Sequence, residues 1–131
     1  MKCNYHKIYD EVVYLKLTRE DLNIALYGAS KCMEMLSDGK HPIYTEALKD
    51  ACKTIDAIII THNDVPAGKN ISFTMKRGML GNITRALLGY ADAMWKAGKN
   101  DKMQDDLRAV WKKLHEQREQ HEAKAIEKGW R

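Results

Sequence analysis

Apolar residues recur every seven positions along Ile71–Trp95, and this pattern constrains the fold more than any other feature of the chain. Phe73, Leu80, Leu87 and Met94 form the repeat, and further apolar residues fall between them. At about 100° per residue, this spacing places the apolar side chains on one broad face of a helix. The segment therefore predicts a long amphipathic helix with one buried face.

Small residues gather on the opposite side of the same predicted helix. Glycines there would let another backbone or a phosphate approach closely, and neighbouring cations could hold an anion. Packing of another helix against the glycines is the alternative, and we favour it because small residues are common where helices meet. The candidate interaction residues are Arg85, Lys96, Lys76, Arg77, Gly78, Gly81 and Gly89.

Three further segments have helical periodicity and are separated by short loops rich in glycine and polar residues. Together the four predicted helices cover about 18–37, 42–62, 72–96 and 101–128. Short connections between four helices favour an antiparallel up-down-up-down arrangement. The predicted fold class is therefore all-α, a four-helix bundle over 18–131 preceded by a short N-terminal arm over 1–17.

The N-terminal arm has two interpretations. Val12, Val13 and Leu15 favour a strand by side-chain type, and a helix is the alternative. A lone strand would need a partner, either a short strand near the N-terminus or another subunit. The arm also carries three tyrosines that could be core, interface or recognition residues: Tyr5, Tyr9 and Tyr14.

The composition is that of one ordinary globular domain. The 131 residues carry a formal net charge of +4, which permits contact with nucleic acid or an acidic partner but requires neither. Three cysteines, without metal-ligand spacing, favour a reducing compartment over a disulfide framework. The first residues lack the apolar core of a secretory signal, and no apolar run approaches the ~20 residues that span a bilayer. We therefore expect a cytoplasmic protein with no membrane partner.

Two histidines on apolar stripes raise the question of a metal site. In an up-down bundle the second and fourth helices end at the same pole, which would bring His62, Asp64 and His121 together. Two imidazoles and a carboxylate are ligands that zinc accepts. Metal sites in helical bundles usually use paired Glu-x-x-His motifs, which this chain lacks. We therefore expect no metal and no cofactor, and keep these three residues as weak candidates.

The sequence predicts a binding protein rather than an enzyme. It has no nucleophile elbow and no phosphate-binding loop, so no catalytic residues are assigned. Apolar residues that fall off the main stripes, such as Met35 and Ile60, indicate a second buried surface, which a subunit interface explains most simply. We predict a homo-oligomer that acts by binding another macromolecule, as a regulator, adaptor or inhibitor.

Two other functions stay open. The first is a nucleic-acid-binding accessory protein that uses the basic residues Lys76, Arg77, Arg85 and Lys96. The acidic residues between the cations make a solvated helix surface the simpler interpretation. The second is a bundle that binds a metal or another small ligand.

No internal repeat is evident in the sequence.

Overall fold

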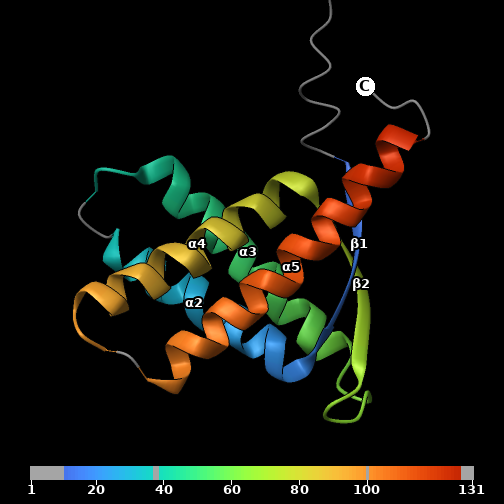
Figure 1. Ribbon diagram of the computed structural model, residues 1–131, viewed down its shortest axis with the longest axis horizontal. Helices are drawn as coiled ribbons and strands as arrows, with labels where there is room; N and C mark the ends of the chain where they lie inside the picture. The colour runs from blue at the N-terminus through green and yellow to red at the C-terminus, as the bar shows by residue number, and fades with distance from the viewer. Residues whose placement is uncertain (1–10, 37–38, 100, 128–131) are drawn as a thin grey trace, which may run out of the picture.

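The computed structural model describes residues 11–36, 39–99 and 101–127. The elements follow one another as β1 (Val12–Thr18), α2 (Arg19–Met35), α3 (Pro42–Thr61), β2 (Asn70–Lys76), α4 (Arg77–Lys96) and α5 (Lys102–Glu127). The order strand–helix–helix therefore occurs twice. Figure 1 shows the two strands together at one end of a body made of the four helices.

The all-α prediction is wrong, because β1 and β2 form a two-stranded antiparallel sheet. The predicted helix over 72–96 begins only at Arg77, and the residues before it belong to β2. Ile71, Phe73 and Met75 alternate with polar side chains, which is the period of a half-buried strand. β1 provides the partner that such a strand needs. Two strand–helix–helix units that share a sheet therefore replace the up-down-up-down bundle.

The other predicted boundaries lie close to the observed ones. The helices expected over 18–37, 42–62 and 101–128 correspond to α2, α3 and α5 within two residues at each end. The arm is a strand from Val12 onward, and its partner is β2 rather than a strand near the N-terminus. Tyr5 and Tyr9 lie outside the described residues. No helix in the described ranges combines the length and apolar character that crossing a bilayer requires.

Each strand runs directly into a helix. Thr18 ends β1 and caps α2, because its side chain accepts a hydrogen bond from Asp21 N at 3.1 Å. The Asp21 carboxylate accepts in return from Thr18 N at 3.2 Å, which completes a capping box. Lys76 stands at the matching position before α4 and makes no side-chain cap. The junction between β1 and α2 is therefore the more firmly fixed of the two.

The two units pack around their first helices. α2 and α4 contact each other, α3 packs on both, and α5 packs on α4, α2 and β1. In the strands and the first helices, the buried residues match between units at constant spacing along the sequence, as Val13 with Ile71 and Leu22 with Leu80. The main core cluster contains Val13, Leu15, Leu17, Leu22, Ala25, Ala51, Ile55, Ile71, Met75, Leu80, Ile83, Leu87, Ala91, Met94, Leu107, Val110 and Leu114.

Candidate functional site

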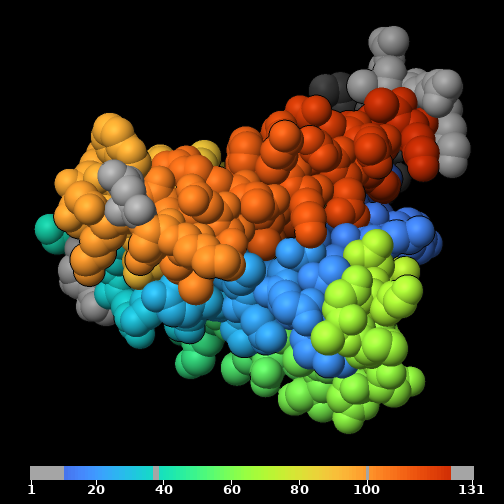
Figure 2. All heavy atoms as spheres, turned by 60° about the horizontal axis from the view of Figure 1, so that its bottom comes forward, coloured from blue at the N-terminus to red at the C-terminus, as the bar shows by residue number. Residues whose placement is uncertain are grey.

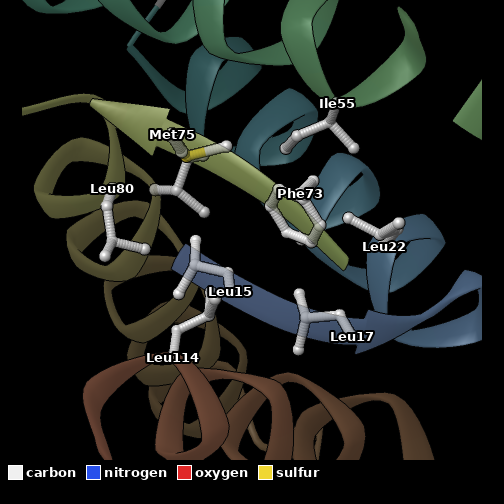
Figure 3. A pocket seen from close by; sticks show the side chains of 10 residues that line it. Leu15, Leu17, Leu22, Ile55, Phe73, Met75, Leu80 and Leu114 are labelled. Atoms are coloured by element: carbon white, nitrogen blue, oxygen red, sulfur yellow. The ribbon is translucent and has the colours of Figure 1, made fainter. Parts of the chain in front are cut away.

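The sheet has one apolar face and one polar face, as expected when successive side chains of a strand point in opposite directions. Five of the six inward side chains are buried, and Phe73 is partly exposed. In Figure 3, Leu15, Leu17 and Phe73 point from the strands towards side chains of the helices. The space between them is lined by apolar residues, and its volume of about 10 Å³ is at the lower limit for one water molecule. This space is a packing gap of the core.

The outward face of the sheet is mostly polar, with the exposed apolar side chain of Val12 at one end, and carries no carboxylate. We define it by eight residues: Val12, Tyr14, Lys16, Thr18, Asn70, Ser72, Thr74 and Lys76. All are exposed except Thr18, which is half-buried. Tyr14 is 78% exposed, more than any other aromatic residue in the described ranges. Figure 2 shows β2, in yellow-green, on the surface of the molecule.

α5 covers the outer edge of β1 at Lys16. Lys16 N donates a hydrogen bond to Gln117 Oε1 at 2.8 Å, and Gln117 Nε2 donates to Lys16 O at 3.0 Å. One side-chain amide thus satisfies both outward backbone groups of a residue in the middle of the strand, much as a neighbouring strand would. β1 is therefore covered at Lys16, whereas no hydrogen bond within the described ranges reaches the outward backbone groups of Tyr14.

The outer edge of β2 has no such cover. Lys16 is paired with Ser72 and Tyr14 with Thr74. Because the backbone groups of Lys16 point away from β2, the antiparallel pattern requires those of Ser72 and Thr74 to point away from β1. In the described part of the chain, no hydrogen bond reaches these outward N–H and C=O groups. β2 is therefore an open edge strand.

An ion pair and a histidine contact lie where α5 passes the start of β1. Arg77 pairs with Glu122, and Arg77 N donates to Glu11 O at 2.7 Å. His121 Nε2 lies 3.3 Å from Glu11 Oε1. These contacts join the C-terminal turns of α5 to the end of the sheet at which β1 begins, and they hold Gln117 against the strand.

The weak metal candidates lie far apart. His62 caps α3, and its backbone O accepts a hydrogen bond from Arg19, which follows β1. His121 faces Glu11, which precedes β1, so the two imidazoles lie at opposite ends of a seven-residue strand that spans roughly 20 Å. Asp64 is exposed beyond His62. Among described residues, no group of three or more His, Cys, Asp or Glu side chains could hold a metal ion.

The predicted glycine face is not one surface. Gly78 is buried, and a Cβ on Gly81 would lie 3.9 Å from Arg118 of α5. A Cβ on Gly89 would have no neighbour within 4 Å. Only the part of α4 near Gly89 is therefore bare, because α5 approaches the helix near Gly81.

The four basic residues predicted to bind nucleic acid also lie apart from one another. Arg85 lies over the ring of Tyr44 at 5.9 Å, and Arg77 is paired with Glu122. Lys96 is the last residue of α4, at the end of the helix remote from the sheet. Of the four, only Lys76 lies on the outward face of the sheet.

The off-stripe apolar residues do not form one patch either. Met35 is 44% exposed at the end of α2, and Ile60 is 64% exposed near the end of α3. The two helices form an antiparallel hairpin, so these side chains lie at its opposite ends. They define no single subunit interface.

A partly buried polar contact lies between α3 and α4. The Tyr44 hydroxyl donates to Asn82 O at 3.3 Å. Burial, reinforced by the neighbouring Cys32, raises the pKa of Tyr44 to about 12. Burial likewise raises the pKa of the Cys32 and Cys52 thiols. These groups stay neutral near pH 7 and behave as parts of the core.

The open edge and the outward face were both missed by reasoning from the sequence. The heptad spacing from Phe73 to Leu80 continued the helical pattern into β2 and masked a strand. The signal that could have revealed it is the strict alternation from Ile71 to Met75, which fits a strand better than a helix.

Comparisons with known proteins add no further constraint. A scan against protein-family models, a search of curated proteins and a search of solved structures each found no match.

Proposed function

We propose that this chain is a non-enzymatic binding protein that self-associates through the open edge of β2 and acts by binding another macromolecule. The observation that supports this most directly is the difference between the two strand edges. Gln117 covers the edge of β1, while Ser72 and Thr74 leave the edge of β2 free to pair. Exposed strand edges template the addition of another strand, so soluble proteins cover or pair them.

β2 is suited to pair with a second copy of itself. Antiparallel pairing about Phe73 places Ser72 opposite the partner's Thr74 and Asn70 opposite the partner's Lys76. The outward N–H and C=O groups of Ser72 and Thr74 then have partners, and no two like charges are opposed. Inward residues meet as Ile71 with the partner's Met75, which keeps the apolar face continuous.

The partly exposed side chain of Phe73 supports the same pairing. It is the one inward residue of the sheet that is not buried, and it lies at the centre of the open strand. Pairing brings the two Phe73 side chains together across the twofold axis and covers them. A two-stranded sheet becomes a four-stranded one, which exceeds the three strands that a sheet with one apolar face needs for independent stability.

The proposal includes a non-enzymatic role in a reducing cytoplasm. Polar groups near the sheet already make structural contacts, such as Asp21, which caps α2 and pairs with Lys113 at 2.8 Å. The thiol of Cys32 is buried, and the raised pKa keeps it protonated. Both features favour binding through a surface over chemistry at a cleft.

Light scattering on size-exclusion chromatography tests the proposed assembly. We expect twice the chain mass of 15.1 kDa at high concentration. Ser72→Pro removes the outward N–H and blocks the edge without breaking the pairing with β1, so this variant should be a monomer. Ser72→Ala keeps the N–H and should remain a dimer. A wild-type monomer over a roughly hundredfold concentration range would refute the proposal.

A further inference from the structure

We infer that the outward face of the sheet binds single-stranded nucleic acid, and that the two copies joined through β2 present one continuous binding surface. The second part rests on the proposed function, whereas the first part holds for a single chain. Four features support the inference: the charge of the outward face, the exposure of Tyr14, the hydrogen-bonding side chains of β2, and the arrangement that the dimer imposes.

The charge of the outward face fits a polyanion. Lys16 and Lys76 lie on this face, and none of its eight residues is acidic. Lys69, the residue directly before β2, is exposed as well. The exposed faces of the helices carry mixed signs, as in α5, where acidic and basic residues alternate. The affinity of a protein for nucleic acid increases with the number of phosphates that its lysines neutralise. The exposed carboxylate of Glu20, just beyond Thr18, bounds the surface at one end.

Tyr14 gives the surface a stacking platform. Its ring stands at the middle of β1, on the same face as Lys16, and is 78% exposed. Aromatic side chains in the centre of an open sheet face stack unpaired bases, and this stacking tolerates any base. Bases within a duplex are already stacked on each other and cannot be reached in this way. The exposed ring therefore favours a single strand over a duplex.

Side chains that hydrogen-bond complete the outward face. Asn70, Ser72 and Thr74 line β2 beside Tyr14 and Lys16, and all three are exposed. Hydroxyl and amide groups of this kind donate to phosphate oxygens and to base edges. The face thus combines phosphate contacts, a stacking ring and polar donors on one rigid element.

The dimer would double this surface. In the register centred on Phe73, a row across the sheet reads Tyr14, Thr74, the partner's Ser72 and the partner's Lys16. The next row is its twofold mate, so the four strands carry two tyrosines and four lysines on one face. The two β1 strands lie three strand spacings apart, about 14 Å. A single strand that crosses the sheet would meet both tyrosines.

Fluorescence anisotropy with labelled oligonucleotides tests the inference. The probes are a fluorescein-labelled poly-dT oligonucleotide, its poly-U equivalent and a duplex of the same length. We expect saturable binding of both single strands and weaker binding of the duplex. Tyr14→Ala should weaken single-strand binding about tenfold. Lys16→Glu should lower the salt slope by ~0.7 for each phosphate that the protein no longer neutralises. Lys53→Glu, at an exposed lysine of α3, is the charge control and should bind like wild type.

The outcomes separate this inference from the proposed function. A dimer that binds neither single strand, or that binds both equally well after Tyr14→Ala and Lys16→Glu, overturns the inference and leaves the self-association intact. A wild-type monomer that loses single-strand binding on Tyr14→Ala refutes the dimer and confirms the face. If the monomeric Ser72→Pro variant binds as tightly as the dimeric Ser72→Ala variant, the continuous surface is wrong.

Discussion

The two strand–helix–helix units have the same layout but differ at the outer edges of their strands. The strand of the first unit, β1, is covered by α5, the second helix of the second unit, which places Gln117 on its edge. When the buried residues of α3 and α5 are matched, as Ile55 with Leu114, the residue of α3 that corresponds to Gln117 is Ile58. Ile58 packs against the core and cannot bond to a strand edge. In the described ranges α5 packs on β1, whereas α3 is not among the elements that pack on β2, so the position of α5 together with Gln117 distinguishes the two strand edges.

The largest expected effect is a difference in stability between truncating the central residue of β1 and truncating that of β2. Leu15→Ala removes a fully covered side chain and should lower the free energy of unfolding by about 2–5 kcal/mol. Phe73→Ala, made in the monomeric Ser72→Pro background, should cost clearly less, because Phe73 is partly exposed there. Urea unfolding followed by circular dichroism measures both. Equal losses would contradict the difference in burial between the two strands.

A second comparison concerns the central helices α2 and α4. A Cβ on Gly28 would meet Leu87, and it would lie 2.8 Å from Leu107 Cδ2, so Gly28→Ala should destabilise the protein by about 1–3 kcal/mol. Gly89→Ala meets open space on an exposed helix position and should stabilise it by about 0.5–1 kcal/mol. Shifts of the thermal midpoint in opposite directions are expected. If Gly28→Ala is neutral, the close approach of the helices is wrong.

A third change makes the two strand edges alike. Gln117→Leu removes the amide that bonds to Lys16 and leaves an edge on β1 as well. We expect a decrease of about 1 kcal/mol in stability, together with species larger than a dimer, because each chain then has two edges that can pair. Sedimentation velocity detects these species. Gln120→Leu, at an exposed position of the same helix, is the control and should stay dimeric.

The smallest expected effect is a dependence of folding stability on pH that comes from Tyr44. Its folded pKa is raised from 10.0 to about 12, so this contribution to stability is complete below pH 10 and is lost as the pH rises towards 12. Tyr44→Phe cannot ionise and should lose less stability over that range than wild type does. Thermal midpoints at pH 9, 10, 11 and 12 measure the difference. Parallel curves would show that Tyr44 is not responsible.

The sequence predicted the helices better than the way they are connected. Amphipathic stripes such as Leu107, Val110 and Leu114 are local patterns, and they correctly located α5. The strand β2 depends on β1, more than fifty residues earlier in the chain, and local periodicity cannot report such a contact. The error at 72–76 then propagated, because an up-down bundle placed His62 and His121 at one pole. The outward face could have been predicted only once β1 and β2 were known to pair.

Residue-resolved hydrogen exchange of the backbone amides of β2 tests the central claim most directly. The outward N–H groups of Ser72 and Thr74 have no partner within the described part of the chain, and pairing with a second molecule would protect them. We expect both amides to exchange slowly, with protection that increases with protein concentration. In the Ser72→Pro variant, the amide of Thr74 should lose this protection. Fast exchange of both amides at every concentration, beside a protected Lys16, would show that the edge of β2 stays open in solution.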